Sequence, residues 1–241
     1  MPAVLIAGVS KVGFGGAFGG LAVPVMSLVI SPVQAAGILL PILCVMDLFG
    51  LRAYEGRWDR ANMRIILPGA LVGIVLGTLC FDMMNDAAIR LIVGTIAVGF
   101  ALSNWLDLVP NRGRAGVSVG KGLFWSTLSG FTSFVGHSGA PPILVYLMPQ
   151  RLDKSVFVAT TVVFFCVVNY VKIVPYGFLG QLSATNLETS MLLLPAAPAG
   201  VWLGQWAHGK VKEMLFYRLS YLLLFAAGAR LMYDGALKLL A

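Results

Sequence analysis

The chain alternates long apolar runs with short charged or turn-rich segments. The apolar runs lie at about 2–30, 33–51, 64–81, 90–108, 119–148, 155–176, 187–207 and 217–239. Most of them reach the length of about 20 apolar residues that one helix needs to cross a bilayer. The pattern predicts an all-α polytopic membrane protein with no separate soluble domain.

Two of the runs, the first and the fifth, are too long for one straight span and are interrupted by glycine. The first contains "GFGGAFGG" at 13–20, and the fifth contains "SFVGHSGAPPILVYLM" at 133–148. Irregular backbone at membrane depth is tolerated only inside protein or beside a water-filled cavity. Each of these runs is therefore expected to form two short helices joined by a break near the membrane midplane.

The second half of the chain repeats the first. A shift of 117 residues places Gly13, Gly19 and Pro24 on Gly130, Gly136 and Pro141. A shift of 122 pairs Cys44 with Cys166, Asp47 with Asn169 and Tyr54 with Tyr176. A shift of 127 pairs Pro68, Gly73 and Gly77 with Pro195, Gly200 and Gly204. These ordered, slowly drifting offsets indicate an internal duplication.

Composition and loop charge give the orientation of the two halves. Charged residues make up only 11% of the chain, and the formal net charge is +7. The loop at 52–64 holds four arginines, whereas its counterpart at 177–186 holds no lysine or arginine. The loop at 82–89 is acidic, whereas its counterpart at 208–216 holds two lysines. By the positive-inside rule, corresponding loops lie on opposite sides, so the halves are expected to be inverted.

Inversion requires an odd number of crossings in each half. We therefore predict two inverted repeats, each made of a re-entrant broken-helix hairpin plus three transmembrane helices. The N-terminal repeat, 1–108, has its hairpin at about 2–30 and its helices at about 33–51, 64–81 and 90–108. The C-terminal repeat, 119–241, has its hairpin at about 119–148 and its helices at about 155–176, 187–207 and 217–239. A cytoplasmic linker, 109–118, joins them.

The alternative topology is eight full spans in two parallel halves. That arrangement would place Lys210 and Lys212 on the outside, against the positive-inside rule.

The breaks carry the candidate chemistry. A new short helix is expected to begin after each break, near 21–24 and 139–142. The free N–H groups and the positive dipole end of such a helix suit an anion. Glycine allows the backbone to approach a ligand because no Cβ intervenes. The sequence alone therefore favours a small-anion site near the midplane.

The two motifs, "GFGGAFGGLAVP" and "GHSGAPPILVYL", resemble the glycine-proline signatures of the sulfite exporter TauE/SafE family. The resemblance covers nearly the whole chain, since the length, the repeat layout and the charge pattern also fit. It implies a secondary transporter of sulfite or an organosulfonate in the bacterial inner (plasma) membrane, a multi-pass location, with export as the expected direction. A transporter of another small anion, such as a carboxylate, and an anion channel remain as alternatives.

The candidate substrate-binding residues all lie at the breaks or next to them. They are Lys11, Gly15, Gly16, Gly19, Gly20, Pro24, Thr132, Ser133, Gly136, His137, Ser138, Gly139 and Pro141. The candidate coupling or pathway residues are Asp47, Asn169, Lys172, Thr160 and Thr161. Lys11 is the leading candidate, because a charge at membrane depth is costly and usually functional. For His137 two interpretations stay open: it donates to an oxyanion or carries a proton, or it only satisfies a freed backbone carbonyl.

Structural readings compete with some of these roles. Asp47 lies five residues before Arg52 and is as well explained by an interfacial ion pair. Lys172 lies near the end of its apolar run and is expected to extend toward the interface. The threonine hydroxyls can bond their own helix. Arg230 and Asp234, at i and i+4, are expected to form a pair on a helix surface.

The sequence does not indicate an enzyme. It contains no zinc-protease motif, no phosphate-binding loop and no clear nucleophile elbow, and "GHSGAPP" resembles the last only loosely. The three cysteines lie in apolar runs without metal-ligand spacing, so no disulfide, metal or cofactor is expected. The expected partners are a small anionic substrate and the lipid bilayer, not nucleic acid. The sequence leaves the oligomeric state open, and a homodimer is one option.

Overall fold

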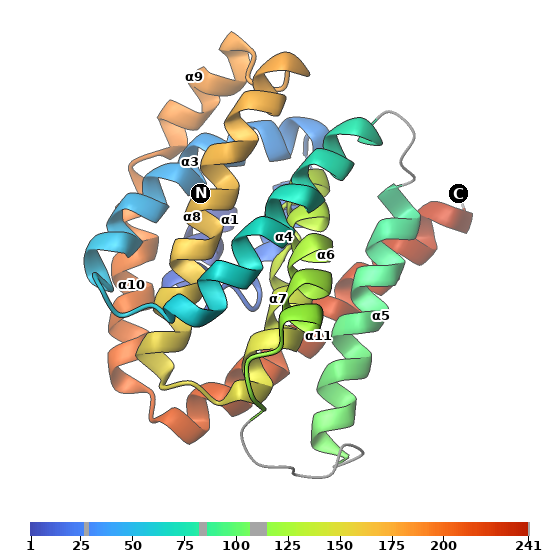
Figure 1. The fold of residues 1–241 in the computed structure, drawn as a ribbon. Coiled ribbons are helices and arrows are strands. Elements are labelled where there is room, and N and C mark those ends of the chain that lie inside the picture. Colours follow the sequence, from blue (N-terminus) through green and yellow to red (C-terminus); the bar gives the residue numbers. More distant parts are fainter. Residues whose placement is uncertain (27–28, 82–85, 107–114, 241) are drawn as a thin grey trace.

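The computed structural model describes residues 1–26, 29–81, 86–106 and 115–240. All of the regular structure in these ranges is helical, and the all-α prediction is confirmed (Figure 1). Of the predicted linker, residues 109–114 lie outside the described ranges, as does Asp82 of the acidic loop.

The first half contains two short helical pieces around a break, followed by three longer helices. Its elements are α1 (Pro2–Gly13), the 3-10 turn η1 (Gly19–Leu21), α2 (Ala22–Met26), α3 (Pro32–Ala53), α4 (Arg60–Leu79) and α5 (Asp86–Trp105). N-caps fix two of the starts. The Ser31 hydroxyl accepts from the Gln34 amide at 3.2 Å, and the Asp59 carboxylate accepts from the Asn62 amide at 2.7 Å.

The second half has the same plan with one difference. Its elements are α6 (Val119–Gly136), α7 (Ala140–Leu147), η3 (Met148–Gln150), α8 (Lys154–Phe178), α9 (Ala184–Leu193), α10 (Ala196–Lys210) and α11 (Glu213–Leu240). The run expected as one helix at 187–207 is divided between α9 and α10. Pro195 has no N–H to donate, and the Pro198 ring would clash with the carbonyl of Leu194 in a continuous helix.

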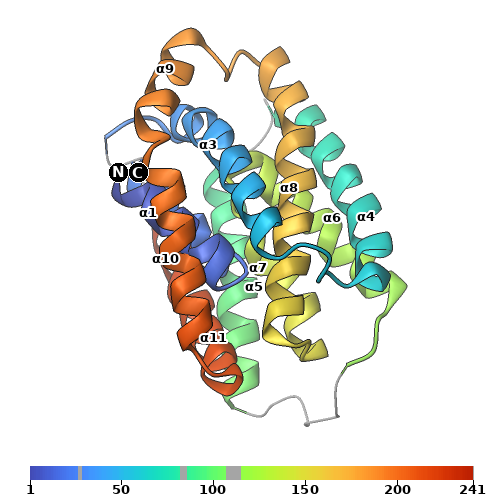
Figure 2. The same ribbon diagram turned by 90° about the vertical axis from the view of Figure 1, so that its left-hand side faces the viewer.

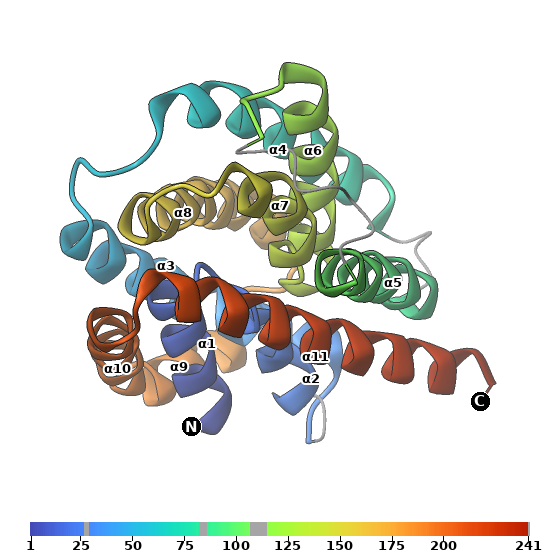
Figure 3. The ribbon, with the colours of Figure 1, turned by 90° about the horizontal axis from the view of Figure 1, so that it is seen from below.

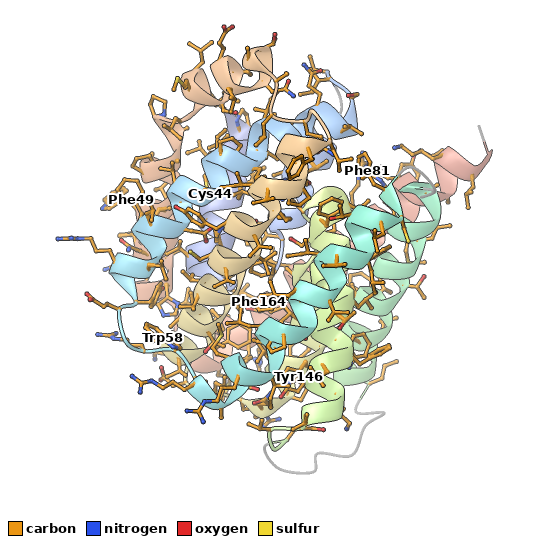
Figure 4. All side chains as sticks on the ribbon, turned by 45° about the horizontal axis from the view of Figure 1, so that its top comes forward. Cys44, Phe49, Trp58, Phe81, Tyr146 and Phe164 are labelled. Atoms are coloured by element: carbon orange, nitrogen blue, oxygen red, sulfur yellow. The ribbon has the colours of Figure 1, made fainter. Side chains whose placement is uncertain are left out.

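Several helices suit a membrane in length and composition. Within the described residues, the stretches Val33–Ala53, Arg60–Leu79, Lys154–Phe178 and Met214–Leu239 are long and apolar enough to cross a bilayer. Large apolar side chains also lie on the surface. Phe49 points away from the bundle, whereas Phe164 is fully buried beneath α4 (Figure 4). Such an apolar exterior suits lipid rather than water.

The helices form pairs that combine elements of the two halves. Figure 2 shows α3 and α8 in the centre, with the α1–α10 pair on one side and the α4–α6 pair on the other. A fourth pair consists of α5 and α11, which lie side by side at the edge in Figure 3. The element that carries each break therefore packs against a helix of the other half.

Glycines at repeat-equivalent positions make these pairs close. A Cβ built on Gly73 of α4 would overlap the Thr127 carbonyl oxygen of α6 and lie 2.7 Å from the Phe131 nitrogen. A Cβ built on Gly8 of α1 would lie 2.7 Å from the carbonyl carbon of Gly200, the repeat equivalent of Gly73. Small residues allow this approach of helix backbones in membrane proteins.

We expect Gly73→Ala to lower stability, because its methyl group has no space at the α4–α6 contact. Overpacking of this kind costs about 1–3 kcal/mol. Gly99→Ala is the matched control, since a Cβ on this α5 glycine meets nothing within 4 Å. Thermal unfolding of the purified variants in detergent should show a lowered midpoint only for Gly73→Ala. Equal midpoints would show that the contact tolerates a methyl group.

Candidate functional site

The two breaks face a shared cavity of about 50 Å³. It is lined by Ala7, Lys11, Gly16, Gly19, Gly20, Ala22, Leu39, Leu43, Ser133, His137, Ala140, Phe165 and Asn169. A buried water needs only about 10–15 Å³ by the same kind of measure, so the cavity has room for a small ion. Both halves of the chain contribute to its wall.

The first break, residues 14–18, depends on glycine for its backbone conformation. Gly15 and Gly16 have φ angles of 61° and 87°, which favour glycine over residues with a Cβ. The break is bonded to the helix before it. The Gly16 amide donates to the Ser10 carbonyl at 2.8 Å, and the Phe18 amide donates to the Ser10 hydroxyl at 3.0 Å. These bonds satisfy backbone groups that a broken helix would otherwise leave unpaired.

The second break, residues 137–139, is held by side chains. His137 adopts the left-handed conformation with φ of 53°, and its amide donates to the Ser133 carbonyl at 3.0 Å. The Ser129 hydroxyl donates to the Gly139 carbonyl at 2.6 Å. A Cβ on Gly139 would lie 2.6 Å from the Ser129 carbonyl oxygen and 2.7 Å from the Ser133 Cβ. Gly139 is thus required for close packing rather than for a positive φ.

Two tyrosines at repeat-equivalent positions hold the ends of the helices that precede the breaks. The Tyr54 hydroxyl donates to the Val12 carbonyl at 2.9 Å, and the Tyr176 hydroxyl donates to the Phe134 carbonyl at 2.6 Å. The repeat offset of 122 pairs these two tyrosines in the sequence, but the sequence around them indicates no role. Their equivalent positions in the two halves are the sequence signal that could have identified this structural role.

The breaks offer an anion fewer free amides than the sequence suggested. The first-turn residues Pro141 and Pro142 of α7 have no N–H, and α2 is only five residues long. In the first break, the amides of Gly16 and Phe18 are already bonded to Ser10. Side chains must therefore supply much of any polar contact with a ligand in the cavity.

The first polar group at the cavity is a buried chain of three residues. Lys11 of α1 forms an ion pair of 2.7 Å with Asp47 of α3, and its ammonium also donates to the Leu43 carbonyl at 3.3 Å. The other Asp47 oxygen accepts from the Asn169 amide of α8 at 2.9 Å. Asp47 is fully buried, so the interfacial pair with Arg52 considered from the sequence is wrong. The repeat-equivalent residues Asp47 and Asn169 instead bond each other.

The second polar group lies on the opposite wall and contains a fully buried lysine. The Lys172 ammonium donates to the carbonyl and to the hydroxyl of Ser133, both at 3.0 Å, and lies 2.9 Å from Nδ1 of His137. His137 Nε2 lies 3.0 Å from the Ala36 carbonyl, which can only accept, so Nε2 carries the proton and Nδ1 accepts from Lys172. The expectation that Lys172 extends to the interface is wrong, because its side chain is enclosed by protein.

The structure brings only part of the predicted site together. Seven of the predicted residues line the cavity: Lys11, Gly16, Gly19, Gly20, Ser133, His137 and Asn169. Asp47 and Lys172 are bonded directly to residues of the wall. Not among the lining residues are Gly15, Thr132, Gly136, Ser138, Gly139, Pro141, Thr160 and Thr161. Pro24 belongs to α2, but its side chain lies outside the described part.

The threonine hydroxyls that do not line the cavity form hydrogen bonds with backbone groups. Thr132 and Thr161 donate to carbonyls of their own helices at 2.8 and 2.9 Å. Thr160 donates to the Val156 carbonyl and accepts from the Asp59 amide. The apolar lining residues, among them Leu39, Leu43 and Phe165, were not predicted, because apolar residues of a membrane chain carry no distinguishing signal.

The predicted surface pair on the last helix is confirmed, and the state of the cysteines is as follows. All three cysteines are free. Arg230 and Asp234 form an ion pair of 3.1 Å on the face of α11.

An apolar exterior and a cavity with a lysine in its wall at two helix breaks are features of membrane transport proteins. A comparison with protein families agrees with this class. The model of the family "Sulfite exporter TauE/SafE" matches residues 1–231, so the chain belongs to the sulfite exporter TauE/SafE family. No curated protein and no solved structure matches the chain. The family is one of transporters, and its name indicates sulfite or a related sulfur anion as cargo.

We expect Asp47→Ala to be strongly destabilising, because it leaves the buried Lys11 ammonium without its counter-ion. Breaking a buried pair in this way costs about 3–5 kcal/mol. The matched control is Asp234→Ala, which breaks a partly exposed pair that contributes about 0.3–0.5 kcal/mol. Unfolding midpoints of the two purified variants should differ clearly. Similar midpoints would mean that Lys11 finds another partner or loses its charge.

Proposed function

We propose that this protein is a secondary transporter of a small sulfur-containing anion, sulfite or an organosulfonate, across the bacterial inner membrane, with export as the expected direction. The observation that carries the proposal is the cavity between the two breaks, where Lys11 and Ser133 line the wall and Lys172 lies directly behind Ser133. Membership of the sulfite exporter family supports the cargo class.

The charges around the cavity favour an anion. Lys11, Asp47 and Lys172 contribute +1, −1 and +1 when all three are ionised, which sums to +1. A buried charge is unfavourable unless it is paired and hydrogen-bonded. An anion in the cavity would supply the missing negative charge.

Two side chains have donors available for that anion. The Lys11 ammonium has three hydrogens and uses two of them, on Asp47 and on the Leu43 carbonyl. The Ser133 hydroxyl accepts from Lys172, which leaves its own proton free to point into the cavity. The two donors come from α1 and α6, so the anion would contact both halves of the chain.

The helix pairs support the inverted-repeat arrangement with re-entrant hairpins. Under the repeat, α1 corresponds to α6 and α4 corresponds to α10, so the pairs α1–α10 and α6–α4 are equivalent. The pair α3–α8 joins equivalent helices directly, as does the pair α5–α11. This contact pattern fits two repeats related by a pseudo-twofold axis, which the inverted arrangement requires.

A channel is the second candidate, because channels also use glycine-rich re-entrant segments. The two broken segments differ in sequence and come from one chain, which favours a carrier over a pore formed by identical subunits. The two are separated by flux of labelled sulfite or methanesulfonate into proteoliposomes. Saturable flux with exchange of internal for external anion supports a carrier, whereas flux that rises linearly with concentration supports a channel. Competition by a simple carboxylate would favour the carboxylate alternative.

We expect Gly20→Ala to weaken anion binding while the protein stays folded. The added methyl would lie between the breaks, and its nearest neighbours, in Ser138, are at 3.5 Å or more. Overpacking a site costs about 1–3 kcal/mol, so the apparent affinity in the flux assay should fall about tenfold. Gly136→Ala is the control, because Gly136 does not line the cavity and a Cβ there meets nothing within 4 Å. Equal affinities in both variants would place the anion elsewhere.

We expect single cysteines at Arg57 and Lys210 to be labelled from the same, cytoplasmic face, and a cysteine at Glu188 from the opposite face. All three positions are exposed in the structure. An impermeant thiol reagent applied to intact cells and to inverted vesicles gives the measurement, in a background lacking the native cysteines. Labelling of the Glu188 position together with the Arg57 position, with the Lys210 position labelled from the opposite face, would contradict the inverted arrangement and favour eight full spans in two parallel halves.

A further inference from the structure

We propose that Lys172 carries the proton that couples this transporter to the proton gradient, with the Ser133 hydroxyl acting as the switch between proton and anion. This rests on the proposed anion-transport function and adds the coupling ion. Proton and anion move in the same direction, so an inward proton gradient drives uptake, and net export requires an outward anion gradient that exceeds it. Its basis is the arrangement of Lys172, Ser133 and His137 on the second wall of the cavity.

Lys172 differs from Lys11 in having no carboxylate. The three hydrogens of its ammonium go to the Ser133 carbonyl, the Ser133 hydroxyl and His137 Nδ1. Within the described part of the chain, no carboxylate lies at ion-pair distance from Lys172, and its side chain is fully buried. A buried ammonium without a counter-ion is costly, so its proton is held best when an anion occupies the cavity.

The other ionisable groups around Lys172 do not replace that anion. Lys11 on α1 and Asp47 on α3 compensate each other. His137, which directly follows α6, is neutral in the tautomer fixed by the Ala36 carbonyl. The remaining neighbours are the thiol of Cys44 on α3 and the Tyr176 ring of α8, whose centroid lies 6.0 Å from the ammonium.

The direction in which the Ser133 hydroxyl donates its proton depends on the protonation state of Lys172. When Lys172 is an ammonium, the Ser133 oxygen must accept from it, and the Ser133 proton is available to the anion. When Lys172 is a neutral amine, it donates to the Ser133 carbonyl and to His137 Nδ1, and its lone pair accepts the Ser133 proton. The hydroxyl then no longer donates into the cavity. Protonation of Lys172 thus creates the donor that the anion needs.

The proton balance follows from these two states. In the loaded carrier, Lys172 is –NH₃⁺ and the bound anion is –1, so the cavity with the Lys11–Asp47 pair is neutral. On release, the anion leaves, Lys172 gives one proton to water on the same side, and the Ser133 proton turns to the amine. The empty carrier is again neutral. Two other states are possible: an empty carrier with a protonated Lys172 and a loaded carrier with a neutral Lys172. Each has a net charge in a buried site, which disfavours movement of the anion without the proton.

The test uses methanesulfonate, which stays a monoanion and so brings no proton of its own. In proteoliposomes of the full chain, uptake of labelled methanesulfonate is measured together with internal pH from a trapped dye. We expect about one proton to enter with each anion, and an acid exterior to accelerate uptake. Uptake of the anion without acidification of the interior would overturn the inference. Absence of any methanesulfonate or sulfite transport would instead overturn the proposed function.

Binding to the purified protein gives an independent readout. Calorimetry in buffers of different ionisation heat counts the protons taken up when methanesulfonate binds, across the pH range in which the protein stays folded. We expect wild type to take up close to one proton per anion over the alkaline part of that range. Zero uptake at every pH would overturn the inference without use of any variant.

Substitutions of Lys172 test whether this residue binds the proton that is taken up with the anion. We expect Lys172→Met to bind methanesulfonate at least about tenfold more weakly and to take up no proton. Lys121→Met, which removes an exposed lysine at the start of α6, should behave as wild type. Lys172→Arg, a cation that stays protonated, should exchange anion but lose acceleration by an acid exterior. Proton uptake that persists in Lys172→Met would assign the proton to another group and overturn the inference.

Discussion

The Asp47 carboxylate holds the centre of this protein together. It bonds Lys11 of the first broken segment and Asn169 of the second half, so one fully buried side chain connects α1, α3 and α8. In a membrane, an unpaired charge at this depth would be far more costly than in water. The positions of the first break and of the two central helices therefore depend on one another. The cavity wall is defined by these contacts, since both Lys11 and Asn169 line it.

Breaking a helix inside a membrane requires that every freed backbone group finds a partner. The two breaks meet this requirement in different ways. In the first break, Ser10 receives the amides of Gly16 and Phe18. In the second, the Ser129 hydroxyl bonds the Gly139 carbonyl. Because these groups are used internally, the breaks provide shape and space, and the lysines and Ser133 provide the polar contacts with a ligand.

Sequence predicted the helical class, the places of the two breaks and the polar residues near them, because glycine, proline and charge are conspicuous in an apolar chain. It did not predict the partners of those residues. Asp47 pairs with Lys11 rather than Arg52, and Lys172 lies inside the protein rather than at its surface. Such pairings depend on how helices far apart in the chain cross, which a local pattern does not contain. The same limit applies to the apolar wall, where Phe165 resembles any other apolar residue in sequence.

The backbone contacts between glycines also determine which parts of the protein can move as units. At Gly73 the backbone of α4 lies directly against α6, and at Gly200 the backbone of α10 lies directly against α1. No side chain separates the two backbones, so the paired helices have little freedom to slide. Each broken segment is thereby fixed to a helix from the opposite repeat. A rearrangement that preserves these contacts cannot rotate one repeat as a rigid body against the other. The parts that move must instead combine helices from both halves of the chain, α1 with α10 and α4 with α6.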